Sequence, residues 1–128
     1  MKFRNIAGRG IFGESKVKGK LPMTGKYMAY VGSYSYTGKA KGITVYDVDV
    51  ETGKFIYRCE VEVDNSSYLK ASQNGQILYS IADEGVVAFR VLPNGSLARL
   101  NSANIRGMRG CHLSTSKADD YILSLIHI

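Results

Sequence analysis

The stretch SYLKASQNGQILYS, residues 67–80, recurs as CHLSTSKADDYILS, residues 111–124, with different letters but the same spacing of apolar and small residues. Three matched pairs are each 44 residues apart: Leu69 and Leu113, Ser72 and Ser116, and Leu78 and Ile122. A second pair of segments, which begin at Gly42 and Gly85, repeats at 42–43 residues, so that GITVYDVDVETGKF matches GVVAFRVLPNGSL. An internal repeat of this length predicts a fold in which similar units stack side by side.

Apolar and polar residues alternate within each unit. GITVYDVDV alternates in this way, is followed by the Gly-containing turn ETGKF, and leads into a second alternating run, FIYRCEVEV. This is a strand–turn–strand pattern with a period of two, and no segment of 11 or more residues has the 3.6-residue period of a helix. Four short strands in 42–44 residues are the size of one propeller blade. We therefore predict an all-β fold, a β-propeller fragment with one complete four-stranded blade and parts of two others.

The turn sequences locate the strands. Asn74-Gly75 and Pro93-Asn94-Gly95 are typical of hairpin turns, which places the four strands of the complete blade, residues 66–105, at YLKAS, ILYSIAD, VVAFRVL and LARLNSA. The preceding blade is expected to lack an innermost strand and to have three others, at residues 28–33, 42–50 and 54–63. The following blade is expected to have an innermost strand and a stub of the second, at residues 111–116 and 121–123. So few repeats should leave apolar blade faces exposed.

The net charge of +6 is concentrated at the start of the chain. Residues 1–27 carry seven of the 17 Lys and Arg residues against Glu14 alone, and the other 101 residues carry ten basic and ten acidic residues. These 101 residues have no net positive charge to attract nucleic acid, so we expect no nucleic-acid partner. Residues 1–22 have no regular periodicity and predict coil. We interpret residues 1–26 as a basic leader that is disordered or not translated; the alternative, an organelle-targeting segment, is disfavoured by its glycines.

The remaining composition argues against a membrane protein, a secreted protein and a disulfide-bonded scaffold. No apolar run approaches the roughly 18 residues of a membrane helix, and no signal peptide is visible, so no membrane contact is expected. Cys59 and Cys111 alone do not form a disulfide framework, which favours a reduced, cytoplasmic compartment. The last six residues, LSLIHI at 123–128, match the translation of a widely used sequencing-library adapter in one frame. We interpret them as an artefact, with a natural apolar strand as the alternative.

Three segments resemble the lactonase family of seven-bladed β-propellers. They are YMAYVGSYSYTGKAKGITVYDVDVETGKF, VDNSSYLKASQNGQILYSIADEGVVAFRVLPNGSL and MRGCHLSTSKADDYIL, within residues 27–122. The family has a YVG-T/S-Y strand, a KGI-x-x-YD strand, a TG turn, an N-x-SYL innermost strand and a CHLS-type strand in this order. The resemblance implies a lactonase. Some members hydrolyse 6-phosphogluconolactone in the oxidative pentose phosphate pathway, in the cytoplasm and without an organic cofactor, and others act on different lactones. We therefore expect a phosphosugar lactone as partner and no cofactor.

Lactone hydrolysis needs a base to activate water, donors for the oxyanion and, for a phosphorylated substrate, a cation. In a propeller these groups would lie at one mouth of the central channel. His112 begins an innermost strand, and the family pattern has a histidine in this place. A neutral imidazole near pH 7 can act as a base or a donor. We predict His112 as the catalytic residue, with a structural histidine that links two blades as the alternative.

Two further residues are predicted to bind the substrate. Arg109 lies three residues before His112, in the loop that feeds the strand, and could bind the phosphate or the carboxylate product. A solvated loop arginine is the alternative, and Arg106 is a weaker candidate. Tyr68 lies 44 residues before His112, at the equivalent position one blade earlier. It is predicted to face the same channel, as a hydroxyl donor or as a wall residue.

Other polar features are interpreted as structural. Asp83 and Glu84 are adjacent loop acids, for which a raised pKa or a metal site is the alternative to solvation. Cys111 adjoins His112, but adjacent strand residues point to opposite faces, so we expect a buried structural cysteine and not a Cys–His nucleophile. GRGIFG, residues 8–13, opens no helix and is not taken as a phosphate loop. No Cys/His metal spacing is present, and no metal site is predicted.

The function favoured by these patterns is hydrolysis of a sugar lactone by the full-length protein. The fragment itself is expected to be inactive, because most channel-lining strands are missing. Two alternatives stay open at this point. One is a non-catalytic propeller that serves as a scaffold for protein contacts, since this architecture supports many functions. The other is a short natural β-protein with a basic leader.

Overall fold

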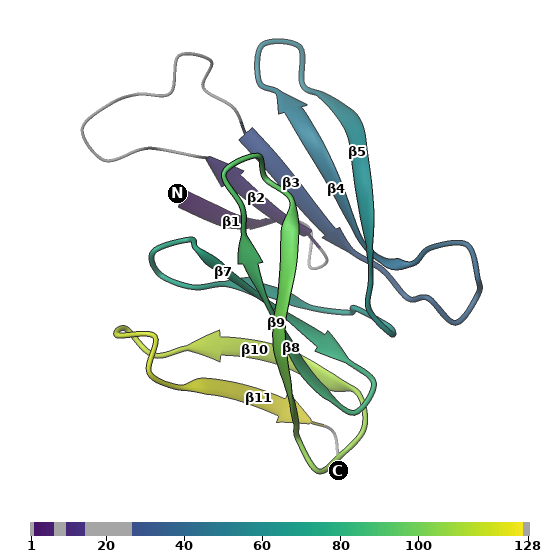
Figure 1. Cartoon of the computed structure of the whole chain (residues 1–128), viewed down its shortest axis with the longest axis vertical. Coiled ribbons are helices and arrows are strands. Elements are labelled where there is room, and N and C mark those ends of the chain that lie inside the picture. The colour runs from purple at the N-terminus through teal and green to yellow at the C-terminus, as the bar shows by residue number, and fades with distance from the viewer. Residues whose placement is uncertain (1, 7–9, 15–26, 127–128) are drawn as a thin grey trace.

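The computed structural model describes residues 2–6, 10–14 and 27–126, which form three antiparallel sheets (Figure 1). The first sheet contains β1 (Lys2–Ile6), β2 (Gly10–Glu14), β3 (Tyr27–Gly32), β4 (Gly42–Asp49) and β5 (Lys54–Glu62). The second contains β6 (Leu69–Ala71), β7 (Ile77–Ala82), β8 (Gly85–Val91) and β9 (Leu97–Asn104). The third contains β10 (Gly110–Thr115) and β11 (Ile122–Ile126). Within these described residues, no helix has the length and apolar character needed to cross a membrane.

The second sheet is the complete blade that the repeat predicts. Its four strands follow one another in chain order, and each coincides with one of the four predicted runs. Strands β3, β4 and β5 match the three strands predicted for the preceding blade to within one residue at each end. In the third sheet, β11 is longer than the predicted stub, because it continues to Ile126. The all-β fold and the complete four-stranded blade are confirmed.

The start of the chain differs from the prediction. Strands β1 and β2 pair with each other, and β2 pairs with β3, so the first sheet continues upstream of the three predicted strands. The prediction of coil, and of a blade without further strands upstream, is wrong for residues 2–6 and 10–14. Backbone N–H and C=O groups at the free edge of β3 need partners, and a hairpin can supply them without an alternating side-chain pattern. The untranslated leader stays a prediction.

The main core lies between the first and second sheets. Tyr30, Ile43 and Val45 of β3 and β4 are fully buried against Leu78 and Phe89 of β7 and β8. We call this contact the covered interface; its buried members are Met28, Tyr30, Ile43, Val45 and Val63 on the first side and Leu69, Ala71, Leu78, Val87 and Phe89 on the second. Alternation along each strand presents these side chains to one face, as the period of two predicts.

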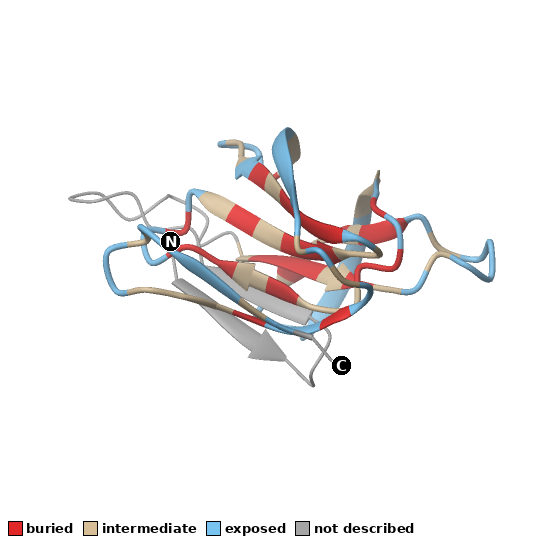
Figure 2. Ribbon diagram, turned by 90° about the horizontal axis from the view of Figure 1, so that it is seen from below, coloured by how far each residue is buried: buried red, intermediate tan, exposed pale blue. Residues whose placement is uncertain are grey.

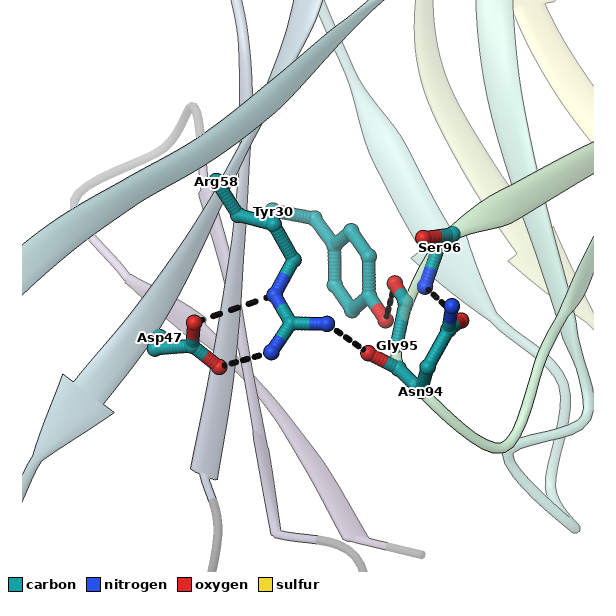
Figure 3. A network of polar contacts seen from close by, with 6 residues as sticks. All are labelled: Tyr30, Asp47, Arg58, Asn94, Gly95 and Ser96. Atoms are coloured by element: carbon teal, nitrogen blue, oxygen red, sulfur yellow. Dashed lines mark hydrogen bonds and ion pairs between the residues drawn. The ribbon is translucent and has the colours of Figure 1, made fainter.

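Polar contacts fix the turn between β8 and β9 against the first sheet (Figure 3). The Tyr30 hydroxyl donates to the Gly95 carbonyl over 2.7 Å in a buried position. Arg58 donates from Nε and Nη2 to both carboxylate oxygens of Asp47, at 3.0 and 2.9 Å, and from Nη1 to the Asn94 carbonyl. Burial raises the pKa of Tyr30. The covered interface therefore combines apolar packing with hydrogen bonds that hold the β8–β9 turn against the first sheet.

Both predicted hairpin turns are confirmed, and each uses glycine in the left-handed region. Gly75 has φ 70° and Gly95 has φ 84°. A Cβ atom on Gly95 would also overlap the Met28 side chain. The backbone conformation at this turn therefore favours glycine, and the Met28 side chain of the first sheet packs closely against it.

The second and third sheets share a smaller core. Ile81, Val86 and Leu113 form its buried centre, whereas Leu100 and Leu123 are 45% and 67% exposed. Figure 2 shows buried bands across the strands and exposed residues on the loops and along stretches of strand, and the outer strands β5 and β9 are largely exposed. The prediction that apolar blade faces are exposed is confirmed for this side of the described structure.

Candidate functional site

A cleft of about 500 Å³ lies where the chain passes from one sheet to the next. Four segments line it: the β3–β4 loop, the β5–β6 linker, the end of β7 and the linker from β9 into β10. Because β6 and β10 are the first strands of their sheets, the cleft lies at the entry to two innermost strands. This is the place where the sequence predicts substrate-binding groups.

Asn65 connects three of these segments. Its side chain accepts hydrogen bonds at Oδ1 from the backbone N–H groups of Ser35 and Tyr36, at 2.9 and 3.1 Å, and Nδ2 donates to the Asp83 carboxylate over 2.8 Å. Its own N–H donates to the Ser35 hydroxyl over 3.0 Å. Asn65 is only 8% exposed and has φ 50°, a conformation that asparagine tolerates better than most residues. One buried side chain therefore sets the relative position of the cleft walls.

A backbone hydrogen bond joins Asp83 and Arg109. The Arg109 N–H donates to the Asp83 carbonyl over 2.8 Å, and Arg109 has φ 55°. The Asp83 side chain is held by Asn65, so both residues of the pair are fixed by local contacts. Asp83 is half-buried and lines the cleft, whereas its neighbour Glu84 is exposed. The expectation of two solvated acids is thus wrong for Asp83, because the Asn65 amide holds its carboxylate.

Two of the three predicted site residues line the cleft. Tyr68 and Arg109 both do, from successive inter-sheet linkers. His112 does not line it; its exposed ring lies against the Tyr68 ring, with centroids 4.7 Å apart and planes tilted by 47°. The structure therefore places the equivalent positions Tyr68 and His112 side by side, as the repeat predicts. Their roles in binding and catalysis stay predictions.

Cys111 is exposed and lines the cleft, so the prediction of a buried cysteine is wrong. The physical reason is a register shift in β10. Gly110 pairs with Ile126 and His112 with Leu125, which leaves Cys111 as an extra residue in a β-bulge. A bulge breaks simple alternation and redirects a side chain. The Cys111 sulfur lies 3.7 Å from the Arg109 carbonyl, and its side chain faces the cleft, whereas His112 does not line it.

The cleft offers chemistry suited to a hydroxylated, anionic molecule. Arg109 supplies a cation that can bind a phosphate or carboxylate in a bidentate manner. Asp83 supplies a carboxylate, and Tyr34, Tyr36 and Tyr68 supply ring faces and hydroxyl groups. Among the described residues, no group of three or more His, Cys, Asp or Glu side chains could hold a metal ion.

Sequence reasoning missed Asn65, whose side chain is hydrogen-bonded to the β3–β4 loop and to Asp83. A signal was present, because Asn65 opens the N-x-SYL segment directly before an innermost strand. The tyrosines of the β3–β4 loop, Tyr34 and Tyr36, were also missed. They come from the preceding sheet, and only the folded structure brings that loop to the cleft.

The sequence matches known proteins over most of its length. The family profile described as "Lactonase, 7-bladed beta-propeller" matches residues 28–125. The chain is 31% identical over 105 residues to a 6-phosphogluconolactonase from Bacillus subtilis, which covers 77% of this chain and 30% of the relative. It is 30% identical over 101 residues to a 6-phosphogluconolactonase from Formosa agariphila, which covers 73% of this chain and 29% of the relative. The chain thus spans about 30% of the length of these relatives.

Solved structures agree with this assignment. A candidate 6-phosphogluconolactonase from Bacteroides fragilis superposes with a TM-score of 0.68 at 31% identity, over 77% of this chain and 28% of that one. A second, from Bacteroides uniformis, gives a TM-score of 0.69 at 24% identity, over 77% and 29%, and supports the fold alone. These matches confirm the predicted propeller fragment. By its profile match and its fold, the chain belongs to the lactonase family of seven-bladed β-propellers.

Proposed function

We propose that the protein to which this segment belongs hydrolyses a sugar lactone of the 6-phosphogluconolactone type. The observation that carries the proposal is the cleft in which Arg109, Asp83 and Tyr68 are held together at the entry to two innermost strands. Two relatives that match this segment are named 6-phosphogluconolactonase, which supports the same substrate class. A cytoplasmic place in carbohydrate metabolism, in the pentose phosphate pathway, belongs to the same proposal.

Each predicted residue has a definite role in this reaction. Arg109 binds the substrate phosphate, or the carboxylate that appears when the ring opens. Tyr68 contacts the sugar through its ring or its hydroxyl. His112 accepts a proton from water as the water attacks the lactone carbonyl, and it returns this proton to the ring oxygen, which leaves as the alcohol when the acyl C–O bond breaks. In this segment the His112 ring lies against the Tyr68 ring, beside a residue that lines the cleft.

The segment alone is expected to be inactive. It spans about 30% of the length of the named relatives, and its cleft is lined by the loops of only three sheets. Oxyanion donors must be fixed within hydrogen-bonding distance of the developing charge, and an open cleft leaves them solvated. The complete reading frame that contains residues 28–125 is therefore the species to assay for lactonase activity.

The test measures release of acid from freshly generated 6-phosphoglucono-1,5-lactone, with the spontaneous reaction subtracted. We expect the complete protein to hydrolyse it and the 128-residue chain to leave the spontaneous rate unchanged. Arg109→Ala should raise the KM for the phosphorylated lactone by about tenfold, the loss of one charge-assisted hydrogen bond, and leave that for glucono-1,5-lactone nearly unchanged. His112→Ala should lower kcat by about a hundredfold or more.

Arg106→Ala is the matched control, since Arg106 is an exposed arginine of the same linker that does not line the cleft. It should leave both KM values unchanged. A complete, folded protein that does not accelerate hydrolysis of either lactone would contradict the enzymatic proposal and favour a scaffold. Equal effects of Arg109→Ala on both lactones would contradict the phosphate-binding role.

A further inference from the structure

Asp83 supplies the carboxylate of the cleft, and the hydrolysis described above gives it no role. It follows β7 directly, in the turn to β8, and is half-buried. Its Oδ1 atom accepts a hydrogen bond from Asn65 Nδ2 over 2.8 Å. Its Oδ2 atom has no hydrogen-bond or ion-pair partner among the described residues. An ionised carboxylate only accepts hydrogen bonds and has about four lone-pair sites, so most of its capacity is left for a ligand.

The orientation of this carboxylate is set by the protein. Asn65 is only 8% exposed, and its Oδ1 atom accepts hydrogen bonds from the backbone N–H groups of Ser35 and Tyr36, at 2.9 and 3.1 Å. Because these two donors fix the direction of the amide, Nδ2 is directed to Asp83. A group held in place by other residues loses little conformational freedom when a ligand binds to it. Asp83 is therefore a preorganised acceptor.

The cation of the cleft lies close to Asp83 but does not neutralise it. The Arg109 N–H donates to the Asp83 carbonyl over 2.8 Å, and both residues line the cleft. In the part of the chain that the structure describes, no ion pair joins their side chains. The cleft thus presents one positive and one negative group separately. A ligand that carries an acidic group and hydroxyl groups matches both, whereas an acid without hydroxyl groups meets only repulsion at Asp83.

The other walls of the cleft suit the same kind of ligand. Tyr34, Tyr36 and Tyr68 line it, and the rings of Tyr34 and Tyr36 meet edge to face with centroids 5.9 Å apart. Aromatic rings offer apolar faces on which the C–H groups of a sugar can pack. Small-molecule sites commonly combine such apolar walls with a few polar groups that fix the orientation of the ligand. Asp83 and Arg109 are the charged groups of this cleft.

We propose that Asp83 is a specificity-determining residue, which accepts hydrogen bonds from the hydroxyl groups of a phosphorylated sugar acid or its lactone. The assignment rests on the proposed function, which gives the ligand its acidic groups, and it adds a requirement for hydroxyl groups. Arg109 binds an acidic group of the ligand, and Asp83 Oδ2 accepts from a hydroxyl group. A site built to bind a hydroxyl group rejects the analogue that lacks it, because a polar group of the protein is then left unpaired.

The test measures equilibrium binding to the complete protein by isothermal titration calorimetry, with two ligands of equal length and equal end groups. 6-Phospho-D-gluconate has hydroxyl groups between its carboxylate and its phosphate, and 6-phosphooxyhexanoate has none. The original protein should bind the first at least about tenfold more tightly. Asp83→Asn should lower this preference about tenfold, the loss of one charge-assisted hydrogen bond.

The preference is the informative quantity, because both ligands carry the same charges. The general effect of removing one negative charge therefore cancels in the ratio of their dissociation constants. Asparagine at this position can still accept the hydrogen bond from Asn65, so the walls of the cleft should be preserved. Circular dichroism verifies that the variant is folded, and Asp83→Ser is a second variant with the same expected result.

Glu84→Gln is the matched control, since Glu84 is the adjacent acid, is exposed and does not line the cleft. It removes the same charge and should leave the preference unchanged. The assignment is overturned if the original protein does not prefer 6-phospho-D-gluconate, if Asp83→Asn keeps the preference, or if Glu84→Gln lowers it equally.

A separate assay of lactone hydrolysis distinguishes this assignment from the proposed function. A protein with an Asp83-dependent preference that does not hydrolyse the lactone supports the binding role of Asp83 and contradicts the enzymatic proposal. An active protein whose Asp83→Asn variant keeps the preference contradicts the role of Asp83 alone.

Discussion

The covered interface and the other side of the second sheet present equivalent strand positions to different surroundings. Tyr30 pairs with Val45 across β3 and β4, as Tyr79 pairs with Ala88 across β7 and β8. We call the second surface, a hollow lined by residues that include Ile77, Tyr79, Ala88 and Leu100, the open groove. Tyr30 and Val45 are fully buried, whereas their counterparts Tyr79 and Ala88 are only partly buried. Both sheets supply an apolar face with the same register and the same bulge. The difference comes from the neighbour, because only the first face meets a complete four-stranded sheet. A blade of this type therefore provides half of each interface, and its stability depends on the next blade.

The largest expected effect comes from removing the aromatic side chain that fills the covered interface. Phe89→Ala should lower the free energy of unfolding by about 3–5 kcal/mol, because it deletes a fully buried ring and leaves a cavity. Urea denaturation followed by circular dichroism measures the change. The substitution makes the covered interface resemble the open groove.

Tyr46→Ala is the matched control for this prediction. Tyr46 is the counterpart of Phe89 in β4, but it is half-buried and packs on the exposed Phe55 and Tyr57 rings. Tyr46→Ala should lower the free energy of unfolding by less than about half as much as Phe89→Ala does, since partly exposed side chains contribute less transfer free energy. Equal losses for the two variants would mean that the two sides of the fragment are equally important, which contradicts the comparison.

A smaller effect is expected from removing the Tyr30 hydroxyl group, which donates a hydrogen bond to the Gly95 carbonyl in the β8–β9 turn. Tyr30→Phe should lower the free energy of unfolding by about 1–3 kcal/mol, because it leaves the buried Gly95 carbonyl without its hydrogen-bond donor. Tyr79→Phe, the same change in the open groove, should stay within about 0.5 kcal/mol of the original chain. Thermal unfolding of both variants, at one protein concentration, measures the difference. If Tyr79→Phe is as costly as Tyr30→Phe, the open groove is already occupied in solution.

The buried Tyr30 hydroxyl should also make the stability of the chain depend on alkaline pH. Burial raises the pKa of Tyr30 above its ordinary value of 10.0, so the unfolded chain releases this proton first. The folded state then binds more protons than the unfolded state, and stability must fall as pH rises above 10, by about 1.4 kcal/mol per pH unit for one such group. Tyr30→Phe should remove this part of the slope. Parallel urea titrations at pH 9 and pH 11 measure it, and identical slopes for the two proteins would contradict a buried, neutral Tyr30.

The fold was largely predictable because the repeat and the turns are local signals. The 44-residue spacing located β6, β7 and β10, and the Asn74-Gly75 and Pro93-Asn94-Gly95 turns separated the strands of the complete blade. Strands β1 and β2 were not predictable in this way. They lack the alternating pattern, and their pairing depends on the free edge of β3.

The site was only partly predictable. Tyr68 and Arg109 were found because they precede innermost strands, and the repeat brings such positions to one end of the fold. Cys111 was misjudged because a bulge, which depends on pairing with β11, changed the direction of its side chain. Asn65 was missed because its importance lies in contacts with the β3–β4 loop, about 30 residues away in sequence.

The smallest expected effect concerns the Arg58–Asp47 ion pair, which lies beside the β8–β9 turn in the covered interface; the bulge of β9 has Leu100 where the bulge of β5 has Arg58. Arg58→Leu places in β5 the residue type that β9 has at Leu100, and so makes the covered interface resemble the open groove in charge but not in packing. The Arg58 and Asp47 side chains are 26% and 28% exposed, so solvent screens their attraction, and the cost should stay below about 1 kcal/mol. Urea denaturation at low and high NaCl measures it, with a smaller salt dependence expected for Arg58→Leu. If Arg58→Leu lowers the free energy of unfolding by several kcal/mol, the Arg58 contacts with Asp47 and the β8–β9 turn, and not apolar packing, are the main difference between the covered interface and the open groove.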